Sequence, residues 1–296
     1  MASPEIDILY LLVGLLVVGG FGLFSMRAKA VNFSGLIAGL VVGLFIWVFG
    51  GWPWFIIILT FHLVAAQFTH FKYEYKRKLG VAEGKKGARA WGNVFANGGI
   101  PAIFALFEKV YPTYFGQSAD IFFAAFIAAI ATTTADTLAT EIGLLYPRDP
   151  RLITSLRKKV PAGTSGGVSP LGEIAVVGGG LLIGGVAWLL AITTNLVPSE
   201  GILGFGPNLL MICVVSAFVG STIDSILGAS IQSTYTCTEC HKLTEHSTHC
   251  GEPAQLVKGW RVLGNNWVNF ISSLCGAGIG LLMFYFSIQF PIVYMH

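Results

Sequence analysis

The stretch IFFAAFIAAIATTTADTLATEIGLLY, from Ile121 to Tyr146, is apolar in its first part and polar in its second. It is long enough to cross a membrane as a helix, for which about 20 residues are needed. Asp136 and Glu141 nevertheless lie inside it. A carboxylate in a membrane segment costs at least about 2.5 kcal/mol on insertion scales, so it is rarely kept without a task. The stretch therefore predicts a membrane helix that carries functional groups towards one end.

The composition extends this interpretation to the whole chain, whose 296 residues are 54% hydrophobic and 11% charged, with a mean hydropathy of +0.71. Soluble domains carry about 25% charged residues, so an integral membrane protein is predicted. The other apolar stretches are Ile6–Phe24, Phe33–Phe49, Trp52–Phe68, Trp91–Phe107, Ile174–Ala191, Leu209–Ile231 and Val268–Ile288. We expect an all-α fold, a polytopic membrane helix bundle of about eight transmembrane helices that forms a single domain over residues 1–296. Gly98, Gly99 and Pro101 make the fourth stretch of the chain the weakest candidate.

The basic residues predict the orientation. If the N-terminus lies outside, the inside loops contain 17 of the 18 Lys and Arg residues, and only Lys109 lies outside. Cytoplasmic loops of membrane proteins are rich in Lys and Arg. We therefore expect a protein of the cell membrane whose two termini lie on the outer face. The net charge of +3 is then explained by topology and does not indicate a nucleic-acid partner. The N-terminal MASPEID lacks the features of a signal peptide, so the first helix is expected to be retained.

This topology brings the membrane carboxylates to one face. Asp136, Glu141, Glu173 and Asp224 all fall at inner helix ends, so we place the active site on the cytoplasmic face. Asp136 and Asp224 are predicted to hold Mg²⁺, which prefers one or two carboxylates together with substrate phosphates and water. Ser225, next to Asp224, is predicted to contact phosphate. The alternative for each aspartate is a structural hydrogen bond to a neighbouring helix.

Glu141 is predicted to be catalytic, but in a role separate from that of Asp136. The two residues are five apart and therefore about 140° apart around a straight helix, so their side chains cannot converge. Either Glu141 makes a second metal contact, or it forms an ion pair with a basic residue of a loop.

Two pairs of segments indicate a weak internal repeat. The segment Thr134-Ala-Asp136-Thr-Leu resembles Thr222-Ile-Asp224-Ser-Ile, and both lie at the inner ends of helices that run inwards. Asn93 and Asn97 are matched by Asn265 and Asn269, each pair four residues apart on one helical face. Polar repeats of this kind often frame a binding site in membrane proteins, so the four Asn residues are predicted to bind substrate.

The glycine-rich loop that follows Arg157 is predicted to bind phosphate. Gly163, Gly166 and Gly167 can take positive φ and direct backbone N–H groups into one anion-binding concavity. Thr164, Ser165 and Ser169 would add hydroxyl groups, while Arg89, Lys158 and Lys159 are expected to act as catalytic cations. The alternative is that the loop is only a tight connection. The basic segment from Lys72 to Lys86 is interpreted as an anchor against anionic lipid.

The loop over residues 232–264 contains a candidate zinc site. Cys237, Cys240 and Cys250 lie there with His246 and His249, and the reducing conditions at a cytoplasmic face argue against disulfides. A C-x₂-C start followed by Cys and His is typical of a small structural zinc site. We predict Cys237, Cys240, His249 and Cys250 as the ligands. The alternative is a set of free thiols, and His246 is a second choice for the fourth ligand.

Several ordered motifs resemble those of one membrane protein family. They are Arg89-Ala-Trp-Gly-Asn-Val-Phe-Ala-Asn-Gly98, Ala135-Asp-Thr-Leu-Ala-Thr-Glu-Ile-Gly143, Val160-Pro-Ala-Gly-Thr-Ser-Gly-Gly-Val-Ser169, Gly220-Ser-Thr-Ile-Asp-Ser-Ile-Leu-Gly228, Tyr235-x-Cys-x-x-Cys240 with His249-Cys-Gly251, and Asn265-Asn-x-Val-Asn269. The family contains the phytyl-phosphate kinases of tocopherol synthesis, uncharacterised archaeal proteins and the animal transmembrane protein nineteen. The resemblance implies phosphoryl transfer from a nucleoside triphosphate to a prenyl monophosphate such as phytyl or geranylgeranyl phosphate. CTP is the expected donor.

The main alternative is a transporter or lipid scramblase, in which buried carboxylates and glycine-interrupted helices are equally common. A transporter needs polar groups that can be reached from both faces. The outer halves of the helices that carry Asp136 and Asp224 are almost wholly apolar, which favours an enzyme that works on one face.

Overall fold

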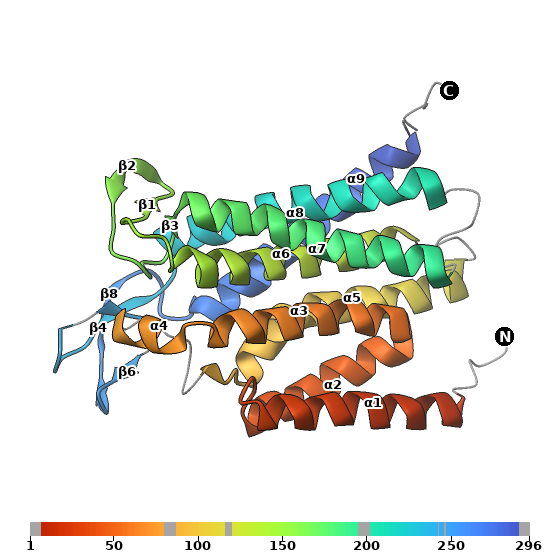
Figure 1. Ribbon diagram of the computed structural model, residues 1–296, viewed down its shortest axis with the longest axis horizontal. Helices are drawn as coiled ribbons and strands as arrows, with labels where there is room; N and C mark the ends of the chain where they lie inside the picture. The colour runs from red at the N-terminus through yellow and green to blue at the C-terminus, as the bar shows by residue number, and fades with distance from the viewer. Residues whose placement is uncertain are drawn as a thin grey trace.

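The computed structural model describes residues 7–79, 87–115, 120–194, 202–241, 243–245 and 247–289. Long helices dominate this part of the chain (Figure 1). The helices are α1 (Ile8–Arg27), α2 (Phe33–Gly50), α3 (Trp52–His70), α4 (Tyr73–Leu79), α5 (Trp91–Phe115), α6 (Asp120–Gly143), α7 (Pro170–Thr194), α8 (Ile202–Ser230) and α9 (Asn265–Gln289). All except α4 run roughly along the long axis of the molecule, so the predicted helix bundle is confirmed.

Seven of these helices are long and apolar enough to cross a membrane, namely α1, α2, α3, α6, α7, α8 and α9. The apolar stretch that was the weakest candidate for a membrane helix forms α5. This helix is continuous over 25 residues although it contains Gly98, Gly99 and Pro101. It lies beside α2, α6 and α9 within the bundle. Large apolar side chains such as Ile8 and Leu16 are exposed on the outer helices, as expected of surfaces that face lipid.

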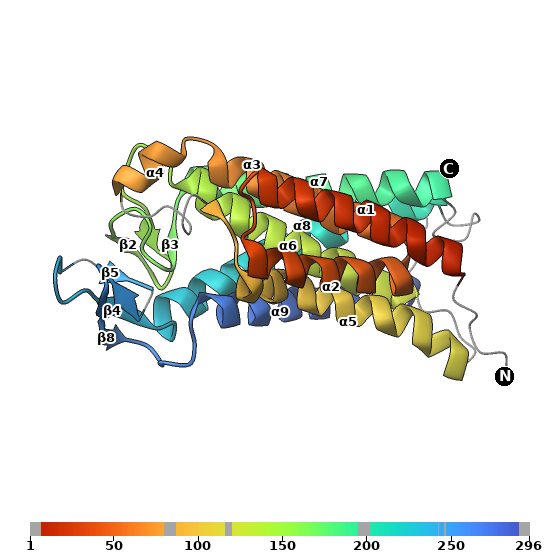
Figure 2. The same cartoon turned by 90° about the horizontal axis from the view of Figure 1, so that it is seen from below.

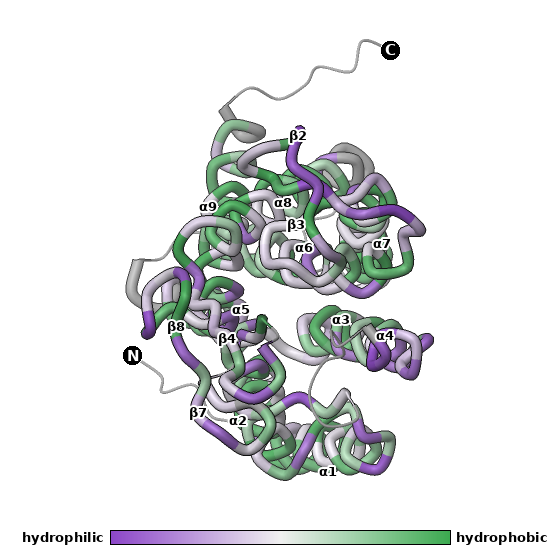
Figure 3. The backbone as a smooth tube through the Cα atoms, turned by 90° about the vertical axis from the view of Figure 1, so that its left-hand side faces the viewer, coloured by the Kyte–Doolittle hydropathy of each residue, from purple (hydrophilic) through white to green (hydrophobic). Residues whose placement is uncertain are grey.

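The polar connections that follow α1, α3, α6 and α8 all lie at one end of the bundle, which we call the polar end (Figure 1). The first turn of α1 lies at the opposite end. Seen along the bundle from the polar end, hydrophilic residues are concentrated in α4, β2 and β7 (Figure 3). The basic loops of the chain therefore gather at one end, as the orientation prediction requires. Which face of the membrane this end occupies stays a prediction.

The connections at the polar end contain short β-strands, which the sequence analysis did not predict. Strands β1 (Arg151–Leu152), β2 (Ser155–Lys159) and β3 (Gly167–Val168) form an antiparallel sheet in the order β2-β1-β3, with Arg151 opposite Lys159 and Leu152 opposite Gly167. A second antiparallel sheet has the order β5-β4-β8, and β6 pairs with β7. These strands are β4 (Thr234–Thr236), β5 (Leu243–Thr244), β6 (Thr248–His249), β7 (Glu252–Pro253) and β8 (Gln255–Lys258). The two three-stranded sheets lie beyond the ends of the long helices (Figure 2).

The long helices form two groups, which are visible from the polar end (Figure 3). One group contains α6 to α9 and the other contains α1, α2, α3 and α5. Helix α6 is central, since it packs against α7, α8 and α9 and also against α3 and α5 of the other group. Its residues from Phe123 to Ala131 are all buried. The candidate functional residues described below come from both groups at the polar end.

Candidate functional site

Two carboxylates from different helices meet at the polar end of the bundle. The side chains of Asp136 on α6 and Asp224 on α8 are joined by a hydrogen bond. Asp224 is buried and Asp136 is partly buried. Ser272 of α9 donates a hydrogen bond from Oγ to Oδ2 of Asp224, at 3.0 Å. Two carboxyl groups in such close contact must share a proton or a cation, because two bare charges would repel each other.

Close helix packing brings these two aspartates together. Thr132, one turn before Asp136, donates from Oγ1 to the Ser216 carbonyl of α8 at 2.9 Å. A Cβ added to Gly220 or Gly276 would lie within 2.3 Å of Thr132 atoms, so both positions require glycine. Small residues at helix crossings allow backbones to approach closely inside a membrane. The depth and facing of Asp136 and Asp224 are therefore set by the α6–α8–α9 contact.

The residues around the pair suit a hard divalent cation. Asn269 lies on α9 one turn before Ser272, and its Oδ1 is buried without a hydrogen-bond partner among the described residues. A buried amide oxygen without a partner is costly, which indicates that something else binds there. Carboxylate and amide oxygens are the donors that Mg²⁺ prefers. Asn269 thus offers an amide oxygen one turn from the Ser272 that contacts Asp224, and the donor types of Asp136, Asp224 and Asn269 fit the predicted Mg²⁺.

Arg89 reaches this region from the other helix group. Its backbone is fixed between α1 and α2, since its N–H donates to the Ala30 carbonyl and its carbonyl accepts from the Asn32 N–H, both at 3.0 Å. The guanidinium group lies over the Phe61 ring, 5.8 Å from the centroid, and the residue is buried. Its charge acts on Asp136. The predicted cation therefore lies near the carboxylate pair.

The predicted substrate-binding Asn residues lie on both sides of this region. Asn97 of α5 donates from Nδ2 to the carbonyl and to Oδ1 of Asn93, at 2.8 and 3.1 Å. Asn265 begins α9, whose first turn packs against the start of α5. Substrate binding by the four Asn residues stays a prediction, as does the internal repeat.

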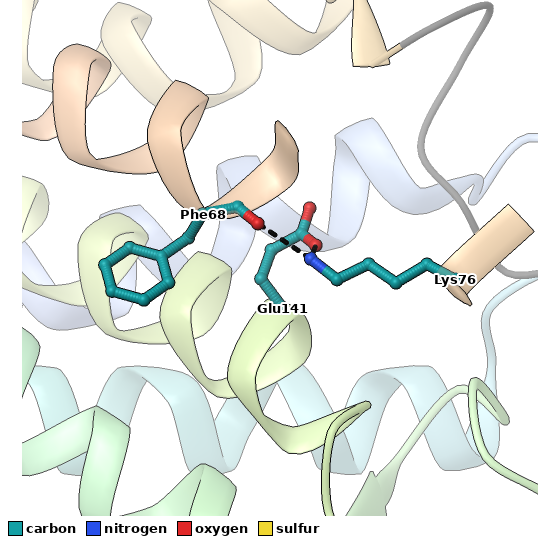
Figure 4. A network of polar contacts seen from close by, with 3 residues as sticks. All are labelled: Phe68, Lys76 and Glu141. Carbon is teal, nitrogen blue, oxygen red and sulfur yellow. Dashed lines mark hydrogen bonds and ion pairs between the residues drawn. The ribbon is translucent and has the colours of Figure 1, made fainter. Parts of the chain in front are cut away.

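Glu141 forms a buried ion pair with Lys76 of α4. Lys76 Nζ lies 2.5 Å from Glu141 Oε2 and also donates to the Phe68 carbonyl at the end of α3, at 2.7 Å (Figure 4). The relative exposures of the two side chains are only 1% for Lys76 and 9% for Glu141. Of the two alternatives for Glu141, the ion pair is the one observed, and its catalytic role stays a prediction. Lys76, assigned from the sequence to a lipid anchor, is instead buried inside the protein.

The glycine-rich loop is more tightly bonded to itself than an open phosphate cradle would be. Gly163 and Gly166 have positive φ, of 82° and 77°, whereas Gly167 lies in β3. The N–H groups of Thr164 and Gly167 donate to carbonyls of the same loop, and the Ser169 hydroxyl accepts from the Gly172 N–H at the start of α7. Gly166 packs on α8, where an added Cβ would lie 2.5 Å from the Ser225 carbonyl. Fewer amides are therefore available to an anion than the sequence suggested.

Lys158 and Lys159 lie on the strand that is farthest from α8, the helix that carries Asp224. Both residues are exposed on β2, at one edge of the three-stranded sheet, whereas β3 at the other edge contacts α8. Their catalytic role stays a prediction and finds no support in this placement.

The predicted zinc loop brings three cysteines together. The Sγ atoms of Cys237, Cys240 and Cys250 all lie within 4.8 Å of one another, and the Cys240 N–H points at Cys237 Sγ at 3.5 Å. Hydrogen bonding with Cys240 is the main cause that raises the pKa of Cys250 to about 11. A metal that binds these thiols would therefore release protons. The His249 side chain and His246 lie outside the described residues, so the fourth ligand stays a prediction.

Comparison with known proteins places the chain in a family. A family model described as integral membrane protein DUF92 matches residues 16–277. The chain belongs to this family. The family membership expected from the motifs is thereby confirmed.

Several relatives of this DUF92 protein match it over most of its length. Protein PGR of Arabidopsis thaliana is 30% identical over 263 residues, which cover 84% of this chain and 88% of the relative. An uncharacterised membrane protein of Methanocaldococcus jannaschii is 26% identical over 275 residues, or 93% of this chain and 94% of the relative. Protein VTE6, chloroplastic, of Arabidopsis thaliana is 25% identical over 256 residues, or 86% and 66%. No solved structure is significantly similar to the chain.

The structure of this DUF92 protein adds a third carboxylate that the sequence analysis missed. Glu245 follows β5 in the cysteine loop and accepts a hydrogen bond from Ser165 Oγ, at 2.5 Å. Its negative charge acts on both Asp136 and Asp224. Burial lowers the pKa of Lys258, and the negative charge of Glu245 opposes part of this shift. A charged residue in a polar loop gives no signal by itself, but its place between Cys240 and Cys250 could have indicated that the loop holds it in position.

Removal of one cysteine is expected to abolish metal binding by the loop of this DUF92 protein. We expect Cys237→Ser to lose the zinc that copurifies with the wild-type protein, because the remaining thiols cannot complete a tetrahedral site. Inductively coupled plasma mass spectrometry of the purified proteins measures this. The matched control is Cys275→Ser on α9, outside the cluster. Equal zinc in the Cys237→Ser and wild-type proteins, or no zinc in either, would contradict the prediction.

Proposed function

We propose that this protein is a prenyl-phosphate kinase. It transfers a phosphoryl group from a nucleoside triphosphate, with CTP as the expected donor, to phytyl or geranylgeranyl phosphate at the cytoplasmic face of the membrane. The observation that carries the proposal is the Asp136–Asp224 pair, two hydrogen-bonded carboxyl groups at the polar end of membrane helices. The resemblance to a family that contains phytyl-phosphate kinases supplies the class of reaction.

The reaction requires charge neutralisation more than proton transfer. An oxygen of the acceptor phosphate forms a bond to the γ-phosphorus of the donor, while the bond from that phosphorus to the bridging oxygen breaks. The products are a prenyl diphosphate and a nucleoside diphosphate. The second pKa of a phosphate monoester is about 6, so the attacking oxygen is already deprotonated at neutral pH and needs no general base. The protein must hold two repelling anions in line.

The described residues can meet this requirement. Asp136, Asp224 and Asn269 would hold Mg²⁺, which supplies positive charge to the donor phosphates when bound. Arg89 is buried near Asp136 and provides a fixed cation for the acceptor phosphate. Arg89 keeps its charge at any physiological pH and presents a planar fork of N–H donors that matches phosphate oxygens.

The transport alternative has less support. Transport needs a polar path between both faces, and the residues of α6 from Phe123 to Ala131 are apolar and at most 5% exposed. The polar groups described above are confined to the other end of this helix. This one-sided arrangement favours an enzyme that works at one membrane face.

The direct test is phosphoryl transfer by the purified protein in detergent with Mg²⁺ and γ-labelled CTP or ATP. Phytyl and geranylgeranyl monophosphate are offered as acceptors, and the matching alcohols serve as controls. We expect label in a prenyl diphosphate, with CTP as the better donor and no label on the alcohols. A folded sample that transfers label to none of these acceptors would overturn the kinase proposal and favour transport.

A further inference from the structure

A pocket opens between α1, α2, α3 and α5, in the helix group opposite Asp224. The space between the lining side chains is about 740 Å³, a figure that includes solvent at the open mouth. Helices α1, α2 and α5 contribute mainly the halves that lie nearer the polar end, with lining residues Val18 to Ser25, Val31 to Gly43 and Arg89 to Gly98. Helix α3 contributes Phe55 to His62, from its opposite half up to its middle. The pocket therefore begins near the membrane boundary and extends into the membrane-spanning part of the bundle.

The lining changes character along the pocket. Its polar members are Ser25, His62, Arg89, Asn93 and Asn97, and most of the remaining lining is apolar. On α1, Ser25 lies seven residues from Val18, which corresponds to about 10 Å along the helix axis. A pocket with a cationic, hydrogen-bonding end and an apolar interior matches a ligand that has an anionic head and a long hydrocarbon tail.

Arg89 connects this pocket to the carboxylate pair. Its side chain lines the pocket and is held over Phe61, another lining residue. Its charge also acts on Asp136 of the other helix group. His62 completes the polar end and is held there by its contact with Ser25, whose Oγ lies 2.8 Å from His62 Nε2. A phosphate bound by Arg89 would therefore lie between the pocket and the carboxylates.

We infer that this pocket binds the isoprenoid chain of the acceptor, with the monophosphate at Arg89. The inference rests on the proposed function for the identity of the ligand. It divides the work between the two helix groups, so that α1, α2, α3 and α5 select the lipid while α6, α8 and α9 hold the phosphoryl donor. Helix packing around the pocket then determines which prenyl chains are accepted.

A glycine offers a specific way to fill the pocket. Gly39 of α2 is part of the lining, and a Cβ added there would meet nothing within 4 Å. By contrast, a Cβ at Gly35 would lie 2.3 Å from the Arg89 carbonyl, and one at Gly43 would lie 2.8 Å from Val18. The Cβ of Gly39→Phe therefore meets no neighbour, and we expect its ring to occupy the pocket that Gly39 lines. Gly178→Phe on α7 is the matched control, because Gly178 is an exposed helical glycine outside the lining with the same open space.

The test uses geranylgeranyl monophosphate with a photoreactive diazirine near the end of its chain, and crosslinked peptides are mapped by mass spectrometry. We expect labelling of α1, α2, α3 and α5, competed by unlabelled geranylgeranyl monophosphate but not by phosphatidylglycerol. Gly39→Phe should reduce this labelling at least about tenfold, while Gly178→Phe should leave it unchanged. Labelling of other helices, equal competition by the phospholipid, or no effect of Gly39→Phe would overturn the inference.

This binding experiment is independent of phosphoryl transfer. If the pocket is labelled as expected but no diphosphate forms in the kinase assay, the proposed reaction is wrong and the pocket assignment stands. If diphosphate forms and Gly39→Phe turns over geranylgeranyl monophosphate as fast as the wild-type protein does, the reaction stands and the pocket assignment is wrong.

Discussion

Replacing Asp136 with asparagine is expected to reduce phosphoryl transfer by roughly 10³-fold, the size of effect seen when a fixed electrostatic contact to a transition state is removed. Asparagine has nearly the same shape and can still hydrogen-bond Asp224, but it removes one of the two charges that would hold Mg²⁺. Insertion and folding should be unaffected, because a neutral amide is cheaper to bury than a carboxylate. Turnover with labelled CTP and thermal unfolding of the same sample measure both effects.

The control for this variant is Asp149→Asn, which removes an exposed carboxylate from the loop after α6. It should leave turnover within about twofold of the wild-type rate, as surface changes away from a site usually do little. Asp224→Asn should lose as much activity as Asp136→Asn, and the double variant should lose little more, since the two residues act as a unit. Near-normal turnover of a folded Asp136→Asn protein would remove Asp136 from the mechanism.

The sequence was sufficient to predict the helices and to place Asp136 and Asp224 at the same end of the bundle, for identifiable reasons. Long apolar stretches have few alternatives to a membrane helix, because backbone groups in lipid must bond internally. The similarity of the Asp136 and Asp224 segments placed both at the same depth, and the structure joins them by a hydrogen bond. The angular separation of Asp136 and Glu141 likewise predicted that these two side chains do not converge, and they contact different partners, Asp224 and Lys76.

The connections at the polar end could not be predicted in this way. Their strands are two to five residues long, too short for a periodic pattern, and they are held by the tertiary structure around them. Glu245 lies in the loop between Cys240 and Cys250 and is held by a hydrogen bond from Ser165, a contact between residues 80 apart that no local pattern predicts. Lys76 is one of several Lys and Arg residues in a basic segment, and nothing local distinguishes the one that becomes buried.

The buried Lys76–Glu141 ion pair gives a second large effect. Lys76→Met is expected to destabilise the protein by about 3–5 kcal/mol, because it leaves the Glu141 carboxylate buried without its partner. The same change removes the hydrogen bond to the Phe68 carbonyl, so α4 should detach from the ends of α3 and α6. Chemical denaturation in detergent measures the loss. Arg77→Met is the control on the same helix, since the Arg77–Glu74 pair is about two-thirds exposed and should contribute less than about 1 kcal/mol.

The double variant Lys76→Met with Glu141→Gln separates the two roles considered for Glu141. Without a buried charge, most of the lost stability should return, as it does when both members of a buried pair are replaced by neutral groups. If Glu141 acts only through its ion pair, this folded double variant should also transfer phosphate at close to the wild-type rate. Recovery of stability together with loss of turnover would instead show that the Glu141 carboxylate takes part in the reaction. Failure of Glu141→Gln to restore stability would mean that the Lys76 contact with Phe68, and not the ion pair, holds α4 in place.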